Sequence, residues 1–262
     1  MHTALTIAGS DSGAGAGIQA DLKTLAAHGV YGTSALTAVT AQNTLGVTSW
    51  VALEADMVIA QIEAVAGDIG ADAVKTGMLA NAAIVEAVAA TIRSLELPQL
   101  VVDPVMVAKG GDRLLEGAAI DAMRTELLPL AHVVTPNVPE AEVLAGMTIR
   151  SIEDMQEAGR RILRLGPRVV LVKGGHLEGP ESIDVACRDG EILEIRGVRV
   201  PTRHTHGTGC TLASAIAANL AKGIEDMEAI RAARAYVEGA ILHAPAIGRG
   251  HGPLSHFWRG VY

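Results

Sequence analysis

The residues best suited to chemistry are His206-Gly207-Thr208-Gly209-Cys210, which open a helix-like run from Thr211 to Lys222. The first turn of a helix leaves backbone N–H groups without partners and carries the positive end of the helix dipole. Such a turn binds anions, typically phosphate, and it lowers the pKa of a cysteine placed there. An anion site and an activatable thiol within four residues indicate phosphoryl transfer. Taken alone, these residues fit an ordinary tight turn with a small buried cysteine equally well.

Two acidic residues follow short apolar runs. Asp103 comes directly after 100–102, and Glu140 comes soon after 132–135. Short continuous apolar runs are typical of strands buried on both faces of a parallel sheet. Magnesium takes oxygen ligands, keeps several waters and needs only one or two carboxylates, so Asp103 and Glu140 are predicted magnesium ligands. The alternative is structural, with Asn137 as an N-cap and Glu140 as a first-turn acid.

Two further loops carry groups that suit a nucleotide and a heterocycle. Lys173 stands beside Gly174 and Gly175 after the apolar run 169–172, where the lysine can meet phosphate oxygens and the backbone can approach closely. Gln42 lies in a polar stretch at a predicted strand end. Its amide can donate and accept at once, which suits the edge of a heteroaromatic ring. Each loop alone is also compatible with a simple turn or a polar strand end.

A glycine-rich loop, Gly9 to Gly17, follows the first predicted strand. A dinucleotide-binding G-x-G-x-x-G pattern would need glycine where Ile18 and Ala20 stand. The chain has no Walker A sequence and no kinase H-R-D loop. The loop is therefore interpreted as wrapping a small acceptor. His204-x-His206 has no third ligand at a spacing that would support a zinc site.

Composition limits the class of protein. The 262 residues are 49% hydrophobic and 2% aromatic, so a core must be built from Ala, Val, Leu and Ile. A net charge of −8 argues against nucleic acid or an anionic membrane as the main partner. Two cysteines do not make a disulfide framework, and no signal peptide or membrane-spanning run is present. We expect one domain over 1–262, soluble and cytoplasmic.

Apolar strand-like runs alternate with segments of helical period. The expected strands are 4–8, 34–39, 71–75, 100–102, 132–135 and 169–172, and the expected helices are 18–28, 56–67, 82–95, 117–128, 139–145, 151–165, 208–222 and 226–243. Asp189-Gly190 between two alternating runs predicts a late β-hairpin. Repeated β-α units predict a mostly parallel sheet with helices on both faces. Ligands bind at the carboxyl ends of such strands, so the polar loops are expected to form one site.

With these segments in place, the chain resembles the hydroxymethylpyrimidine and phosphomethylpyrimidine kinases of thiamine biosynthesis, which belong to the ribokinase-like family. The resemblance runs nearly end to end. It rests on the motifs at 4–13, 17–24, 41–44, Lys75-Thr76-Gly77-Met78-Leu79, Val102-Asp103-Pro104-Val105-Met106, Thr135-Pro136-Asn137, Val172-Lys173-Gly174-Gly175-His176 and 204–212. It implies a three-layer α/β/α sandwich, ATP and magnesium as cofactors, and a homodimer.

The resemblance also implies roles for individual residues. Those matched to the pyrimidine are Asp21, Gln42 and Met78, with Gly9 in the loop that wraps the acceptor. Those matched to ATP and magnesium are Asn137, Glu140, Lys173, Gly174 and Gly175, with Asp103 as the second acid. The anion hole and the catalytic position correspond to Gly207, Thr208, Gly209 and Cys210. Most sugar and nucleoside kinases of this type carry Asp where Cys210 stands.

The expected function is two successive ATP-dependent phosphorylations of 4-amino-5-hydroxymethyl-2-methylpyrimidine, first to the monophosphate and then to the diphosphate. Cys210, as a thiolate, would accept the alcohol proton. One alternative is a pyridoxal kinase with the same fold, although Gln42 favours the pyrimidine because pyridoxal-preferring relatives carry Met there. The other is a nucleotide- or pyrimidine-binding regulator without turnover.

Overall fold

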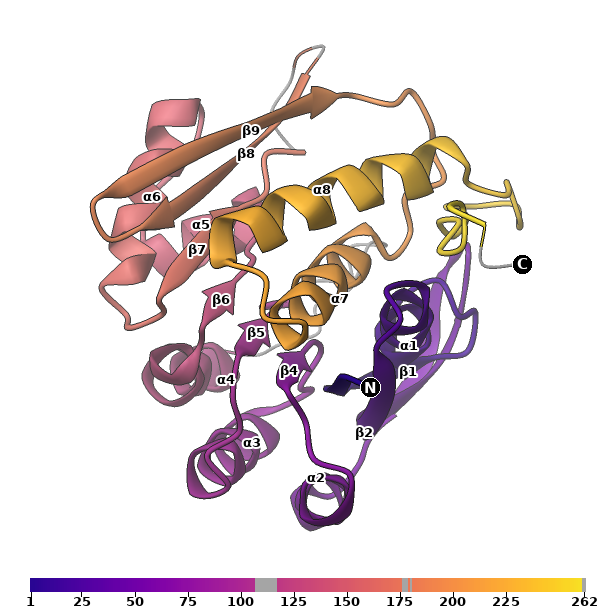
Figure 1. Ribbon diagram of the computed structural model, residues 1–262, viewed down its shortest axis with the longest axis vertical. Coiled ribbons are helices and arrows are strands. Elements are labelled where there is room, and N and C mark those ends of the chain that lie inside the picture. Colours follow the sequence, from indigo (N-terminus) through magenta and orange to yellow (C-terminus); the bar gives the residue numbers. More distant parts are fainter. Residues whose placement is uncertain (107–116, 176–178, 180, 261–262) are drawn as a thin grey trace.

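One sheet of nine strands organises the part of the chain that the computed structural model describes, residues 1–106, 117–175, 179 and 181–260 (Figure 1). The strand order is β3-β2-β1-β4-β5-β6-β7-β8-β9. The six central strands, β2-β1-β4-β5-β6-β7, pair in parallel. The β2–β3, β7–β8 and β8–β9 pairs are antiparallel. The strands are β1 (Thr3–Asp11), β2 (Tyr31–Asn43), β3 (Gly46–Ala52), β4 (Ala73–Thr76), β5 (Leu100–Val102), β6 (Val133–Val134), β7 (Val169–Val172), β8 (Glu181–Arg188) and β9 (Glu191–Val198).

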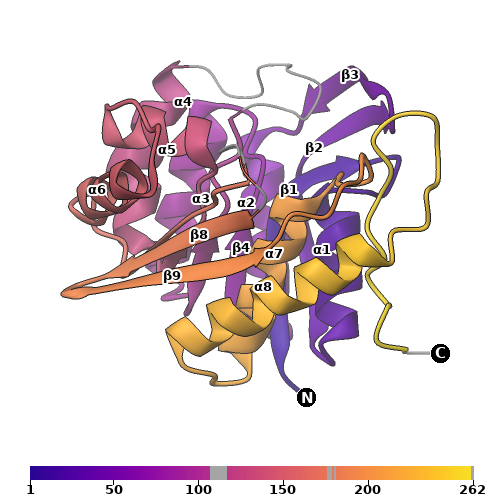
Figure 2. The same cartoon turned by 90° about the horizontal axis from the view of Figure 1, so that it is seen from above.

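Helices cover both faces of this sheet, which confirms the predicted three-layer sandwich (Figure 2). One face packs against α2 (Ala55–Asp68), α3 (Ala82–Ser94), α4 (Gly117–Ala122), α5 (Val138–Ala145) and α6 (Ile152–Leu163). The other packs against α1 (Gly17–Ala27), α7 (Thr208–Ala221) and α8 (Asp226–Leu242). Both cores consist almost entirely of aliphatic side chains.

Helix α7 is the best buried helix of the second layer. Every residue from Thr211 to Ala221 is buried, because α8 covers it on one side and the sheet on the other. A helix that is apolar all round belongs in a protein interior. Its N-terminal turn therefore has a fixed position at the carboxyl edge of the parallel strands. Among the described residues, no helix combines the length and the apolar character that crossing a membrane requires.

The structure departs from the sequence prediction in three places. β2 runs over Tyr31–Asn43, well beyond 34–39, because it bridges β1 and the additional strand β3. The apolar pattern does not predict β3, since most of its side chains are exposed at the sheet edge. The helix expected over 117–128 turns into a π-helical turn (Met123–Leu127) and a 3-10 turn (Leu128–Leu130). Part of the loop expected after β5, and His176, lie outside the described residues.

Candidate active site

A cavity of about 1300 Å³ opens at the carboxyl edge of the parallel strands, against the start of α7. It collects residues from loops that are far apart in the sequence. The predicted site residues that line it are Gly9, Gln42, Met78, Asp103, Asn137, Glu140, Lys173, Gly175, Gly207, Thr208, Gly209 and Cys210. The expectation that these loops converge on one site is therefore confirmed for the described residues.

The turn before α7 requires glycine at its first position. Gly207 has a φ of +83°, and a Cβ at this position would lie 1.8 Å from the carbonyl oxygen of Gly15. Thr208 Oγ1 donates to the carbonyl of Thr205 at 2.7 Å, so its side chain closes the turn without covering the helix end. Among the described residues no side chain caps α7. Its first-turn N–H groups are therefore presented to the cavity, where they can bind an anion.

Cys210 behaves differently from the sequence expectation. Burial raises the pKa of its thiol to about 11, and Asp21 and Asp103 add to this effect. Lys75 and a hydrogen bond from the backbone of Gly17 act in the opposite direction but do not outweigh burial. The expected lowering of the Cys210 pKa by the helix end is therefore wrong, because the side chain is desolvated among carboxylates. The resting group is a thiol.

One lysine and two acids form a charged cluster on the floor of the cavity. Lys173 Nζ lies 3.0 Å from Asp103 Oδ1, and both side chains are largely buried. Burial raises the pKa of Glu140 to about 7; Lys173 opposes this and the Asp103 charge adds to it. Burial alone would lower the pKa of Lys173, but the two acids outweigh it and raise it. The lysine is therefore a stable cation, and it lies beside the anion turn, where a Cβ on Gly209 would be 3.2 Å from its Nζ.

Asn137 and Glu140 form a capping box at the start of α5. The Glu140 N–H donates to Asn137 Oδ1 at 2.9 Å, and the Asn137 N–H donates to Glu140 Oε2 at 2.8 Å. Asn137 also pairs with Lys173 in an isolated parallel bridge. The structural alternative, with Asn137 as an N-cap and Glu140 as a first-turn acid, is therefore confirmed. The capping box additionally holds Glu140 beside the lysine and Asp103.

Asp11 organises the glycine-rich loop. Its carboxylate accepts hydrogen bonds from the N–H groups of Gly13 (2.8 Å), Gly15 (3.0 Å) and Ala16 (2.8 Å). At the start of this loop, a Cβ on Gly9 would lie 3.4 Å from Met78 Sδ, so these two residues flank the same part of the cavity. Gln42 reaches the same region from the end of β2. The acceptor side of the cavity thus combines a polar amide with a thioether wall.

Two of the predicted residues do not line the cavity. Asp21 is 0% exposed, and its carboxylate accepts from Thr6 Oγ1 (2.6 Å), Ser214 Oγ (2.7 Å) and Lys75 Nζ (2.8 Å). Because its oxygens are occupied, Asp21 supports the site from below and does not contact a ligand. Gly174 is packed against β8: a Cβ there would lie 1.7 Å from the carbonyl oxygen of Ile183. Glycine at this position therefore lets the chain pass close to β8.

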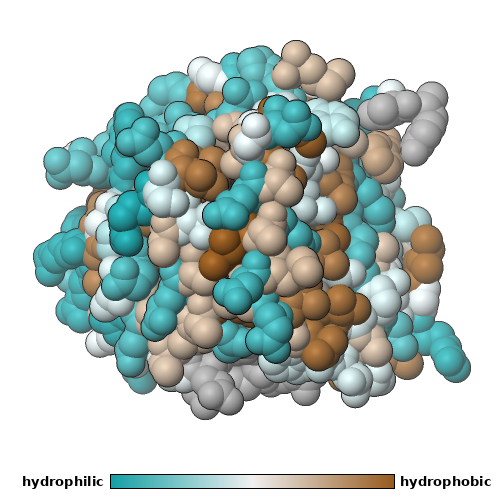
Figure 3. Space-filling view, turned by 90° about the horizontal axis from the view of Figure 1, so that it is seen from below, coloured by the Kyte–Doolittle hydropathy of each residue, from teal (hydrophilic) through white to brown (hydrophobic). Residues whose placement is uncertain are grey.

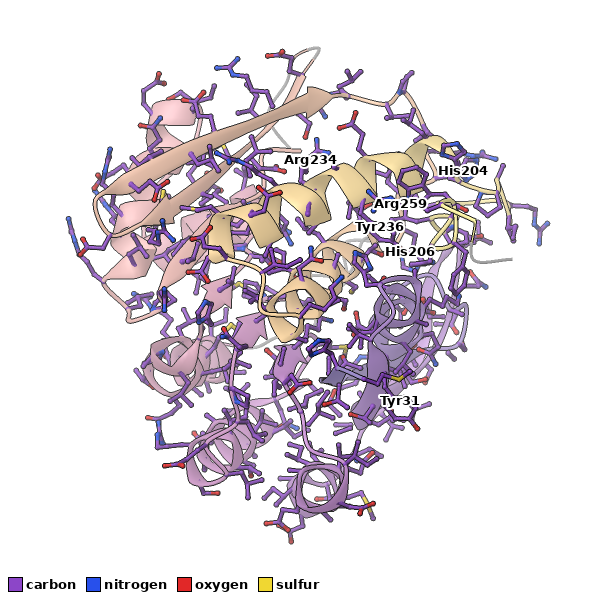
Figure 4. The ribbon with its side chains drawn as sticks, in the orientation of Figure 1. Tyr31, His204, His206, Arg234, Tyr236 and Arg259 are labelled. Carbon is purple, nitrogen blue, oxygen red and sulfur yellow. The ribbon has the colours of Figure 1, made fainter. Side chains whose placement is uncertain are left out.

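Sequence reasoning missed two charged pairs. The first is the pair of Lys75 with Asp21, in which Lys75 also lines the cavity near Cys210. The sequence signal that could have indicated this pair is a single lysine at the end of a buried strand. Arg234 reaches from α8 toward the β8–β9 hairpin and binds Oδ2 of Asp184, on β8, at 2.9 Å (Figure 4). Asp184 Oδ1 in turn accepts from the N–H of Gly174 at 2.8 Å. Because these partners are distant in sequence, no local pattern indicates the second pair.

Comparison with known proteins identifies the family. A family model described as phosphomethylpyrimidine kinase matches residues 11–255. A hydroxymethylpyrimidine/phosphomethylpyrimidine kinase of Synechococcus elongatus is 53% identical over 258 residues, which cover 97% of each chain. The crystal structure of a Clostridium difficile phosphomethylpyrimidine kinase matches with a TM-score of 0.83 at 44% identity, over 92% of this chain and 100% of that one. A Bacillus subtilis pyridoxal kinase, solved as an ADP complex, matches with a TM-score of 0.93 at 40% identity over the full length of both chains. The chain described here belongs to the phosphomethylpyrimidine kinase family.

Proposed function

We propose that this protein is a bifunctional kinase of thiamine biosynthesis. It transfers the γ-phosphoryl group of ATP to 4-amino-5-hydroxymethyl-2-methylpyrimidine, and then phosphorylates the monophosphate to the diphosphate. The observation that carries this proposal is a single cavity that holds the open start of α7, the Lys173 cluster and the Gln42 amide. These are an anion site, a phosphate-binding cation and a group able to recognise a ring edge.

The chain's own residues act mainly by positioning and by charge, as phosphoryl transfer requires. The N–H groups of Gly209 and Cys210 hold the transferring phosphoryl group, and Lys173 binds the phosphate chain. Apolar side chains along the same cavity, including Val198, Val237 and Ile241, fit the flat face of a base. Met78 and Gln42 hold the acceptor ring so that its hydroxymethyl group points toward Cys210.

The two acids fit a hydrated magnesium ion. A Cβ on Gly209 would lie 3.5 Å from Asp103 Oδ2, so this oxygen faces the anion turn while Oδ1 binds Lys173. The raised pKa of Glu140 reflects its burial, and a divalent cation beside it would stabilise the ionised carboxylate. We therefore propose that Asp103 and Glu140 would hold magnesium. When bound, the ion neutralises charge on the phosphates.

The second candidate function is that of a pyridoxal kinase, which the structural similarity to the Bacillus subtilis enzyme favours. Release of ADP, measured in parallel with the pyrimidine alcohol, its monophosphate and pyridoxal, separates the two. We expect both pyrimidines to be preferred over pyridoxal, and Gln42→Met to reduce that preference because it removes the amide that recognises the ring. Preference for pyridoxal by the wild-type protein would overturn the proposal. Absence of pyrimidine-dependent ADP release would favour a binding protein without turnover.

Replacing Asn137 by alanine tests the role of the capping box. We expect a loss of about 1 kcal/mol of stability, since an N-cap is removed, together with a several-fold rise in the KM for ATP with magnesium. The reason for the second effect is that Asn137 holds Glu140 beside Lys173. Denaturant unfolding and steady-state kinetics measure the two effects.

Ser151→Ala is the matched control for this substitution. Ser151 forms a capping box with Asp154 at the start of α6 and does not line the cavity. We expect a similar loss of stability and an unchanged KM for ATP. If the KM rises equally in both variants, the Asn137 effect is a general consequence of reduced stability and the assigned role is wrong.

Several properties of the whole protein extend the proposal. We propose a cytoplasmic enzyme of one domain that acts as a homodimer, with the edge strand β3 near the contact, because Trp50 and Val51 are exposed there. Nucleic acid is not expected as a partner at a net charge of −8.

Figure 3 shows one face of the molecule, on which hydrophobic residues are interspersed with hydrophilic ones. Sedimentation of the purified protein tests the homodimer.

A further inference from the structure

His206 joins three parts of the site. The residue is 8% exposed, and in the view of Figure 4 it lies between α8 and α1. A Cβ on Gly15 would lie 2.3 Å from its Cδ2, so the ring packs closely on the glycine-rich loop. Its Nε2 lies 3.1 Å from Asp11 Oδ2 and 3.2 Å from the terminal nitrogen of the Gln42 amide. One ring nitrogen therefore faces both a carboxylate and the amide that recognises the substrate ring.

The carboxylate determines where the proton of His206 lies. Asp11 accepts three backbone N–H groups, and an ionised carboxylate can only accept. Burial raises the pKa of Asp11, but the bonds from His206, Ala16 and Gly13 outweigh burial and lower it. A bare lone pair on Nε2 would face this negative oxygen at 3.1 Å and be repelled. The Nε2 atom of His206 therefore carries hydrogen and donates it to Asp11.

A protonated Nε2 fixes the orientation of the Gln42 amide. Two donors cannot face each other, so the amide must present its oxygen to His206, which exchanges the positions of its oxygen and nitrogen. Its NH₂ group then faces Thr40 Oγ1, which lies 3.3 Å from the amide. That hydroxyl gives its only hydrogen to the Ser10 carbonyl at 2.8 Å, so its oxygen is free to accept. In this orientation the Nε2–H of His206, the Thr40 hydroxyl and one amide N–H of Gln42 each have an acceptor.

We propose that His206 is a positioning residue that determines ring specificity: its Nε2–H binds Asp11 and the Gln42 oxygen together and fixes which edge of the amide faces the substrate. The inference rests on the proposed function, in which Gln42 recognises the ring. An aminopyrimidine places a ring-nitrogen acceptor beside an amino donor, and an amide of fixed orientation pairs with both. A pyridine ring that carries hydroxyl and aldehyde groups lacks this edge. Preorganisation of the amide thus selects the pyrimidine.

The test compares His206→Leu with His206→Gln. Both lose the ring that packs on Gly15, but the glutamine NH₂ can reach the position of Nε2 and donate to both partners. We expect His206→Leu to raise the KM for the pyrimidine alcohol about tenfold, as loss of one well-made hydrogen-bond pair would. The KM for ATP and the kcat/KM for pyridoxal should stay within about twofold of wild type, the normal spread for an untouched interaction. His206→Gln should restore most of the pyrimidine KM. Equal defects in both variants, or equal losses with both alcohols, would overturn the proposal.

A double-mutant cycle removes the contribution of general damage. In a Gln42→Met background His206 has no amide to orient, so His206→Leu should leave the preference for pyrimidine over pyridoxal unchanged. Additive effects of the two substitutions on that preference would count against the coupling.

The tautomer of His206 is measured on the wild-type protein, so this measurement does not depend on whether the His206→Leu variant folds. A nitrogen–proton correlation spectrum, assigned with His206→Gln, should show a protonated Nε2 at His206 under neutral conditions. A bare Nε2 would refute the inference. This result is independent of turnover: if the protein fails to phosphorylate the pyrimidine, the proposed function fails while the hydrogen-bond assignment is still tested.

Discussion

Replacing Cys210 by alanine is expected to slow phosphorylation of the pyrimidine alcohol by about 10²-fold or more, the usual contribution of a general base. The second phosphorylation should change by less than about tenfold, because a phosphate monoester has a second pKa near ~6 and is already largely ionised at neutral pH. Single-turnover rates of the two steps, measured separately from the alcohol and from the monophosphate, check this difference.

The raised thiol pKa adds a pH dependence to the same prediction. With a pKa of about 11, only about 10⁻⁴ of the thiol is ionised at pH 7, since each pH unit changes the ratio tenfold. The base form increases as the pH rises toward 11, so the alcohol step should accelerate by nearly an order of magnitude per unit between about pH 7 and 9. The second step should lack this slope, and Cys210→Ala should remove it from the first.

Cys187→Ala serves as the control for loss of a thiol. Cys187 is buried between β8 and α6, its pKa is also raised to about 11 by burial, and it does not line the cavity. We expect reduced stability and no difference between the two phosphorylation steps. Equal slowing of both steps by Cys210→Ala, at unchanged KM, would instead give Cys210 a role in shaping the anion turn.

Replacing Lys75 by methionine is expected to lower the free energy of unfolding by about 3–5 kcal/mol, because it leaves the Asp21 charge buried without its partner. The two side chains are 2% and 0% exposed, and Nζ lies 2.8 Å from Oδ2. Burial alone would lower the pKa of Lys75, but Asp21, Cys210 and Asp103 together outweigh burial and raise it, so Lys75 is a cation. Urea unfolding followed by circular dichroism measures the change.

Lys75→Met combined with Asp21→Asn is the matched control. The amide oxygen can still accept from one of the two hydroxyls, Thr6 or Ser214, the amide NH₂ can donate to the other, and no charge is left buried. The double variant should therefore be more stable than Lys75→Met alone. A loss of less than about 1 kcal/mol in the single variant, the range of an exposed pair, would show that Asp21 becomes neutral or that water reaches it.

The elements that the sequence predicted well are those with a strong local pattern. The buried strands β5 and β7 match the predicted 100–102 and 169–172, because both faces of a parallel strand require apolar residues. The start of α7 was predictable since its glycines precede a long buried helix. β3 was not predictable, because an exposed edge strand lacks an apolar face.

The site likewise contains residues that the sequence could place and properties that it could not predict. Asp103, Glu140 and Lys173 follow strand ends, so topology alone brings them together. The burial of Asp21 and the raised pKa of Cys210 depend on partners from other elements, and only the assembled structure shows them. The hydrogen bond between Asp11 and His206 spans 195 residues, so no motif spacing could indicate it.

Phosphorus magnetic resonance of one reaction tests the central claim most directly. The purified protein is mixed with the pyrimidine alcohol, ATP and magnesium, and the spectrum is followed in time. We predict a monophosphate resonance that appears first and then gives way to the two coupled resonances of a diphosphate, with matching formation of ADP. A spectrum in which the pyrimidine gains no phosphate, while pyridoxal in a parallel sample does, would contradict the proposed function.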